Sequence, residues 1–277
     1  MPAQLPFLGV GLGYRSELDE EIQRHRPLID WLEVVSDHYL DRPAEQLAPV
    51  HRLRRDVPLV AHGLELSIGT HGELDAGYVE SLAAFVSAVE APWCSDHLCC
   101  TRAGGVSLGQ LTPLVRDRTT AAEVARKAQQ VQDRVGVPFL LENITYYIDL
   151  SSPLTEAQFL TEVLEHCACG LLLDLTNLHI NAVNHGFGTE EFLDGIPLER
   201  VVQIHLAGGE SGPSLLLDTH SARVPDEVFE LLEYVVPRAP HLKGVMIERD
   251  QDYPEDFGEV ADDLLRVRRI VGNGGAR

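Results

Sequence analysis

The chain has 277 residues, with 22 basic and 43 acidic side chains and a formal net charge of −21 at pH 7. This negative field repels phosphate backbones and disfavours general binding to nucleic acid, so we expect no nucleic-acid partner. No stretch approaches the roughly 18 consecutive apolar residues of a membrane helix, and the first residues, MPAQLP, lack a basic segment followed by an apolar one. We therefore expect a cytoplasmic protein with no membrane partner.

Apolar runs and helical patterns alternate along the whole chain. Most runs are continuous rather than alternating, which is typical of parallel strands covered on both faces. They predict strands at residues 7–14, 31–36, 58–68, 93–98, 138–144, 170–175, 201–207 and 244–249. Between them, apolar residues three and four apart predict helices, as over residues 79–89 and 121–135. Asp75 and Thr120 are expected to cap these two helices, and Gly136 to end the second.

This alternation predicts an α/β fold, the (β/α)8 or TIM barrel. No linker, repeat or low-complexity tract divides the chain, so we expect residues 1–277 to form a single domain with its core at about residues 7–270. The competing fold is an open doubly wound sheet, which normally carries a glycine-rich phosphate loop after its first strand. Gly9, Gly11 and Gly13 lie there but lack the GxGxxG spacing, so the barrel is favoured.

Short apolar runs in this chain repeatedly end in a histidine or a carboxylate. The runs end at His62, His97, Glu142, Asp174, His205, Asp218 and Glu248. In a barrel the carboxyl ends of all strands meet at one mouth, where active sites are built, so we expect these side chains to lie together there. Glu33, within strand two, is a further candidate for the same mouth. We expect Asp218 and His220 on the loop after strand seven, and Asn177 follows Asp174 by three residues.

The convergence of these side chains predicts a polynuclear metal site. Burying several unpaired acids and imidazoles together costs several kcal/mol for each group, and bound cations remove that cost. The candidates suffice for about two or three ions that keep positions open for water or substrate. The candidate metal ligands are His62, His97, Glu142, Asp174, Asn177, His205, Asp218, His220 and Glu248. Imidazole and carboxylate without thiolate suit non-haem iron, manganese or zinc, and the residues alone do not choose between iron and zinc.

The five cysteines do not form matched CxxC pairs. A structural zinc site or an iron–sulfur cluster is therefore disfavoured. We expect them to be reduced thiols that pack as small apolar side chains and have no catalytic role.

Ordered motifs around the candidate ligands resemble those of one family. They are HGLELS from residue 62, SDHL from 95, LLEN from 140, GLLLDLTN from 170, NHG from 184, HLAG from 205, DTH from 218 and ERD from 248. Over roughly residues 7–260 the chain is similar to the multinuclear non-haem iron-dependent oxidative enzymes (MNIO), formerly a family of unknown function, which include the methanobactin-synthesis oxidase.

The resemblance implies a barrel with two or three iron ions in mixed ferrous and ferric states and dioxygen as co-substrate. It implies an oxidoreductase that modifies a residue, cysteine foremost and aspartate or asparagine in some members, of a ribosomally synthesised precursor peptide. Many members work with a separate partner protein that captures the peptide. The iron-binding motifs match all the candidate ligands named above. Glu142 and Asp174 are the expected bridging carboxylates, and Glu142, Asp174 and His205 the expected catalytic residues.

Two other functions stay open from the residues. The same ligands on the same barrel would serve a metal-dependent hydrolase or isomerase, similar to an abasic-site endonuclease or a sugar isomerase. The net charge argues against a DNA substrate, and an isomerase would usually need a catalytic lysine or fewer histidines. Lys127 and Lys243 are the two lysines, and neither lies at the carboxyl end of an expected strand. The third function is non-enzymatic, a barrel that stores metal or serves as a partner scaffold.

Overall fold

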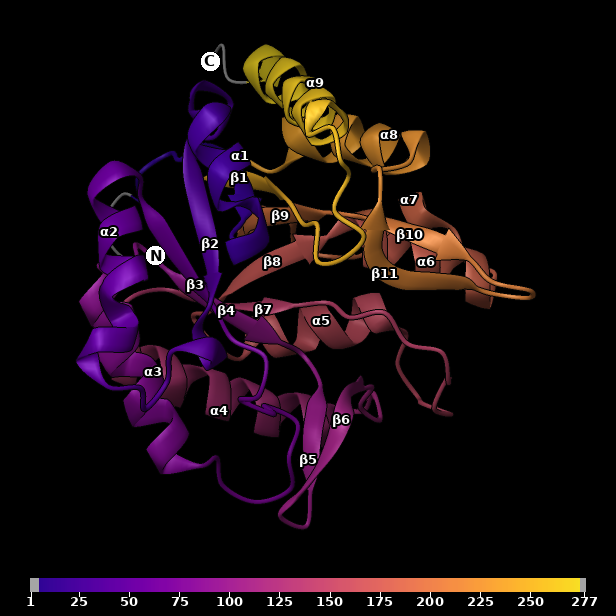
Figure 1. Cartoon of the computed structure of the whole chain (residues 1–277). Coiled ribbons are helices and arrows are strands. Elements are labelled where there is room, and N and C mark those ends of the chain that lie inside the picture. The colour runs from indigo at the N-terminus through magenta and orange to yellow at the C-terminus, as the bar shows by residue number, and fades with distance from the viewer. Residues whose placement is uncertain (1–4, 275–277) are drawn as a thin grey trace.

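The computed structural model describes residues 5–274 and contains a closed barrel of eight parallel strands (Figure 1). In barrel order they are β1 (Gly9–Gly13), β12 (Gly244–Ile247), β9 (Val201–Leu206), β8 (Gly170–Asp174), β7 (Phe139–Glu142), β4 (Cys94–His97), β3 (Leu59–His62) and β2 (Trp31–Val35). β1 pairs with both β2 and β12, which closes the sheet and excludes an open doubly wound fold. The TIM-barrel prediction is confirmed.

Helices surround the barrel, as Figure 1 shows. They are α1 (Asp19–Arg24), α2 (Ala48–Asp56), α3 (Ala76–Val89), α4 (Arg118–Val135), α5 (Glu156–Glu165), α6 (Leu175–His185), α7 (Thr189–Asp194), α8 (Asp226–Val235) and α9 (Gly258–Gly274). Asp75 caps α3 and Gly136, at φ 75°, ends α4 as predicted. Thr120 does not cap α4, because the helix begins earlier and the Asp117 side chain accepts from the Thr120 N–H. Within residues 5–274 no helix has the length and apolarity needed to span a membrane.

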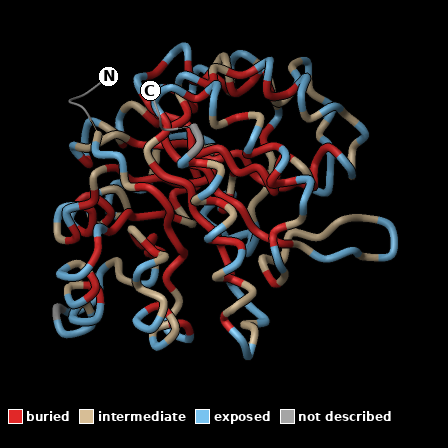
Figure 2. Tube along the Cα trace, turned by 90° about the horizontal axis from the view of Figure 1, so that it is seen from above, coloured by how far each residue is buried: buried red, intermediate tan, exposed pale blue. Residues whose placement is uncertain are grey.

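Two hairpins follow barrel strands on the mouth side. β5 (Cys100–Ala103) pairs with β6 (Val106–Thr112) after β4, and β10 (Gly208–Ser211) pairs with β11 (Leu216–Ala222) after β9. The β10–β11 hairpin projects from the body of the molecule and its tip is exposed (Figures 1 and 2). Asp218 and His220 lie in the connection after the seventh barrel strand, β9, as predicted, but this connection is a hairpin rather than a loop. They belong to β11, whose leucines are only half-buried because the strand pairs outside the barrel.

Alternate side chains along each barrel strand face opposite directions and form two apolar cores. An inner core fills the barrel, and a larger one lies between the strands and the helices. The inner core consists of Trp31, Val60, Trp93, Leu140, Leu172, Val202 and Met246. Four candidate ligands each follow an inner-core residue by two positions and therefore also face inward, above that core. These ligands are His62, Glu142, Asp174 and Glu248.

Glycines on two neighbouring strands make room for the largest side chain of the inner core. A Cβ atom at Gly11 would lie 2.4 Å from the Trp31 ring, and one at Gly244 would lie 2.8 Å from it. The fully buried indole of Trp31 thus occupies space that any larger residue would take. The result is a solid apolar floor beneath the mouth.

Candidate metal centre

Three groups of side chains at the mouth bring possible ligand atoms within 4.8 Å of one another. The first contains His62, His97 and Glu142; the second Glu142, Asp174, His205 and Glu248; the third His220, Glu248 and Asp250. Strand register brings them level, since His97 pairs with Glu142 and Asp174 with His205. Glu142 belongs to two groups and so does Glu248.

The two carboxylate oxygens of Glu142 face different groups. Oε2 lies 3.4 Å from His62 Nε2 and 3.3 Å from His97 Nε2. Oε1 lies 3.1 Å from His205 Nδ1. Oε2 is buried and has no hydrogen-bond partner. One carboxylate can therefore contact two cations, one through each oxygen.

Asp174 contributes a free oxygen to the second group. It is fully buried, and its Oδ1 caps α6 by accepting from the Asn177 backbone N–H at 2.7 Å. Its Oδ2 is buried without a partner. The Asn177 side chain is itself engaged, since it accepts from Thr145 at 2.6 Å and donates to the Asn143 carbonyl at 2.9 Å. Asn177 thus binds Asp174 through its backbone N–H, while its side-chain amide binds Thr145 and Asn143.

The third group lies where β11 meets the strand end of β12. His220 Nδ1 lies 3.4 Å from Glu248 Oε2 and 3.2 Å from Asp250 Oδ2. Its other nitrogen, Nε2, lies 2.9 Å from Asp218 Oδ1, so Asp218 contacts the opposite edge of the ring. His220 adopts φ 49°, a left-handed conformation that is uncommon for residues other than glycine and is found preferentially at functional sites.

The histidines of the centre neutralise some of its carboxylates and not others. Burial by itself raises the pKa of Glu142, but the imidazoles of His97, His205 and His62 outweigh it and hold that pKa below its usual value. Burial of Glu248 is likewise outweighed by His205 and His220, and its pKa lies well below the usual value. Burial and the nearby Glu142 raise the pKa of Asp174 well above its usual value. The centre thus holds more acid than its imidazoles neutralise.

These side chains fit metal ions. Glu142 Oε2 and Asp174 Oδ2 are buried polar atoms without hydrogen-bond partners, and each such atom costs about 1–3 kcal/mol. Carboxylate oxygens and imidazole nitrogens are ligands that non-haem iron, manganese and zinc accept. A cation in each group would meet these atoms and offset the excess negative charge.

The structure brings most of the expected ligands together and adds one. Asp250 was missed, although it follows Glu248 by two residues within the ERD motif. Asp218 and Asn177 lie beside the three groups, at His220 and Asp174 respectively. Asp174, expected as the second bridging carboxylate, falls in one group, whereas Glu248 falls in two.

Glu33 lies beneath the centre, outside all three groups. Its buried Oε2 is 3.2 Å from His205 Nε2 and accepts from Gln203 Nε2 at 2.5 Å. Gln203 Nε2 also lies 2.6 Å from His205 Nε2, and Gln203 Oε1 accepts from Trp93 Nε1 at 2.6 Å. His205 is therefore held at Nε2 from below and presents Nδ1 to Glu142 and Glu248. No motif in the sequence marks Gln203 as part of this arrangement.

We expect Glu33→Gln to weaken metal binding by about 10–100-fold, because the substitution removes the charge that orients His205 while keeping the side-chain size. A metal titration of the variant against the unchanged chain measures the effect. Glu165→Gln, at an exposed position on α5, is the matched control. Equal affinity in Glu33→Gln and Glu165→Gln would show that Glu33 does not act through His205.

Nearly the whole chain matches one known family. Residues 9–272 match the model of a family described as "RiPP precursor modification enzyme MbnB/TglH/ChrH". The chain belongs to this family. Members of the MbnB/TglH/ChrH family are enzymes that modify ribosomally made precursor peptides, and the buried His, Glu and Asp groups give this chain a place for metal ions.

Two relatives, both named UPF0276 proteins, align with nearly the whole chain. A UPF0276 protein of Caulobacter vibrioides is 36% identical over 278 residues, with 98% of each chain covered. A UPF0276 protein of Anaeromyxobacter sp. is 38% identical over 265 residues, which cover 95% of this chain and 93% of the relative.

Solved structures share the barrel at low identity. A D-tagatose 3-epimerase-like protein has a TM-score of 0.62 and 15% identity, with 96% of this chain and 99% of that chain covered. Endonuclease IV from Thermus thermophilus has a TM-score of 0.59 and 18% identity, with 97% and 100% covered. At such identity the likeness shows the fold alone and leaves function to the residues of the site.

Proposed function

We propose that the chain is a multinuclear non-haem iron oxidase that uses dioxygen to modify a residue of a ribosomally synthesised precursor peptide. Cysteine is the favoured target, with aspartate or asparagine as the alternatives. The observation that carries the proposal is the pair of ligand groups joined by the two oxygens of Glu142, inside a family of precursor-modifying enzymes. No cysteine joins these groups among residues 5–274, in keeping with iron held by imidazole and carboxylate.

In this proposal two or three irons, in mixed ferrous and ferric states, are held by the three groups. Glu142 and Glu248 bridge neighbouring groups, His62 and His97 complete the first, Asp174 and His205 the second, and His220 and Asp250 the third. Asp218 and Asn177 hold the ligands beside them. Bound iron would supply open positions for dioxygen and substrate, and the electrons that the oxidation exchanges.

The chain's own contribution is position and shielding. The inner core closes the barrel beneath the ligands and keeps water from reaching them from below. Glu33 fixes the ring of His205, and Asn177 fixes Asp174 through a backbone N–H. Fixed ligands hold the reacting groups in one geometry, which lowers the entropic part of the barrier.

Exposed apolar side chains on elements beyond the barrel strands support contact with a peptide, or with a partner protein that presents it. Val106 and Leu108 on β6, and Tyr147 and Ile148 on the loop between β7 and α5, are exposed. The Tyr147 hydroxyl also accepts from the Asp218 backbone N–H at 2.9 Å, which ties this loop to the metal centre. The proposal places the protein in the cytoplasm, where its free cysteines stay reduced.

The lysines do not support an isomerase. Lys127 lies buried on α4, where it donates to the carbonyls of Ile68 and Thr70, and Lys243 directly precedes β12, at the end opposite the mouth. Neither lysine is available to the candidate metal centre.

Metal content is the first test. We expect elemental analysis to find about two or three irons per chain in protein expressed with added iron and purified without chelator. Oxygen uptake with a candidate precursor peptide then separates an oxidase from a metal store. Zinc or manganese, with little iron even after anaerobic iron loading, would overturn the iron assignment and favour a hydrolase or an isomerase.

A further inference from the structure

A groove of about 470 Å³ lies outside the metal centre. It is formed by the loop that follows β7, the start of α5, and the segment from the end of α6 through α7. A small inner chamber with room for about one water molecule, about 20 Å³, adjoins it and shares Arg116, Tyr146 and Glu156 with it. None of the side chains that line the groove belongs to the three ligand groups.

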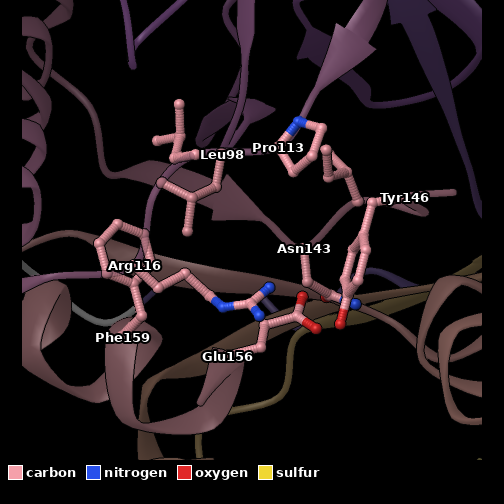
Figure 3. A pocket seen from close by; sticks show the side chains of 9 residues that line it. Leu98, Pro113, Arg116, Asn143, Tyr146, Glu156 and Phe159 are labelled. Carbon is pink, nitrogen blue, oxygen red and sulfur yellow. The ribbon is translucent and has the colours of Figure 1, made fainter. Parts of the chain in front are cut away.

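Glu156 is a half-buried acid that forms no ion pair among residues 5–274. Burial raises its pKa to about 7, against the opposing influence of Arg116 and the Tyr146 hydroxyl. Its Oε2 is inaccessible and has no hydrogen-bond partner. Figure 3 shows Arg116 and Tyr146 pointing toward the Glu156 carboxylate. A polar atom that is buried and unpartnered at a groove wall marks the place where a donor is missing.

Arg116 forms no hydrogen bond or ion pair with Glu156, and two of its guanidinium nitrogens donate to other groups. Its Nη2 donates to Asp149 at 2.6 Å, and its Nε donates to the Leu154 carbonyl at 3.4 Å. The guanidinium carbon also lies 5.3 Å from the centre of the Tyr146 ring. Arg116 is therefore paired with Asp149, and Glu156 stays uncompensated.

The rest of the groove favours a cation with an apolar stem. Its acidic side chains, Asp149, Glu156 and Glu191, outnumber its single arginine. Phe187 and Phe192 add aromatic surface, and the ring of His185 stacks on Tyr146 at 4.5 Å. Aromatic faces attract ammonium and guanidinium groups, and the stems of lysine and arginine pack on apolar surface.

We propose that this groove binds an arginine or lysine side chain of the precursor peptide, whose charged head pairs with the Glu156 carboxylate. The proposal rests on the proposed function, since the peptide is the occupant. The loop that forms the groove begins directly after Glu142, and Asn143 lines the inner chamber. The Asn143 side chain also hydrogen-bonds the backbone of Asp174 at 2.9 Å through both its oxygen and its nitrogen. A basic residue bound in this groove anchors the peptide beside the mouth of the barrel and determines which peptide residue reaches the metal centre.

Calorimetric titration with N-acetyl-arginine amide, and with the neutral citrulline analogue of the same shape, tests the proposal. We expect the arginine probe to bind at least about ten-fold more tightly than the citrulline probe, because only its charged head pairs with the carboxylate. Glu156→Gln should reduce arginine binding to the citrulline level, and Glu165→Gln on the same helix should not change it. Arginine affinity should rise from pH 6 to 8 as Glu156 ionises, and Glu156→Gln should lose that rise.

Equal affinity for the two probes, or undiminished arginine binding in a folded Glu156→Gln variant, would overturn the proposal. Thermal unfolding shows whether the Glu156→Gln variant folds. If it does not fold, the comparison of the two probes on the unchanged chain still tests the proposal. Probe binding needs neither metal nor turnover, so it is measured on both metal-free and metal-loaded protein. If the titration shows no preference for the arginine probe, the groove proposal fails and the oxidase proposal is unaffected. If metal analysis finds zinc while the arginine probe binds as expected, only the oxidase proposal is overturned.

Discussion

Replacing Glu142 with alanine is expected to reduce peptide oxidation by at least about 100-fold and to remove metal from two sites at once. Its Oε2 faces His62 and His97, and its Oε1 faces His205, so a single truncation opens both groups. Losing a ligand costs more than losing an orienting neighbour, for which 10–100-fold is typical. Elemental analysis and oxygen uptake with the peptide measure the two effects.

Asp174→Ala is the informative comparison, because Asp174 belongs to the second group alone. It should also lose activity but retain metal in the first group, so its residual metal content should exceed that of Glu142→Ala. Glu165→Gln, exposed on α5, should keep both metal and activity. Full activity in both Glu142→Ala and Asp174→Ala would contradict the assignment of the centre.

Removing the metal is expected to lower the thermal midpoint by roughly 15–30 °C. An ion at about a thousand times its dissociation constant stabilises the folded state by about 4 kcal/mol, and each kcal/mol shifts the midpoint of a domain this large by about 2–4 °C. Two occupied sites give the expected range. The physical origin is that metal-free protein keeps the buried Glu142 Oε2 and Asp174 Oδ2 without partners. Calorimetric unfolding before and after chelation and dialysis measures the shift.

The same treatment should shift Glu142→Ala much less, since that variant has lost the metal of two groups before chelation. Restoring ferrous iron under anaerobic conditions should bring the midpoint of the unchanged chain back. A midpoint that does not respond to metal removal, in protein shown by elemental analysis to have carried the metal, would mean that the ions do not contribute to folding stability.

The fold and most of the centre were predictable because one periodicity controls both. Parallel strands buried on two faces read as continuous apolar runs, and a polar residue that ends such a run continues the inward face. Val60 and His62, or Leu140 and Glu142, show the relation. The ends of the apolar runs therefore identified the candidate ligands on β3, β4, β7, β8 and β9.

Residues outside this periodicity were harder to place. Asp218 ends an apolar run, but that run belongs to the β10–β11 hairpin outside the barrel, and the run alone does not show with which strand it pairs. Asp250 lies past the end of β12, where only the three-dimensional approach of His220 makes it a neighbour. Asn177 was expected as a ligand from its spacing, and only its contacts show that Thr145 and Asn143 occupy its side chain.

The contact between Trp93 and Gln203 gives the protein an optical property. The chain has two tryptophans, and both belong to the inner core, with ring centres 6.3 Å apart. Trp93 connects through Gln203 to Glu33, which faces His205. All intrinsic indole emission of this chain therefore originates in the floor of the candidate metal centre, so we expect its intensity and wavelength to change when a metal binds there.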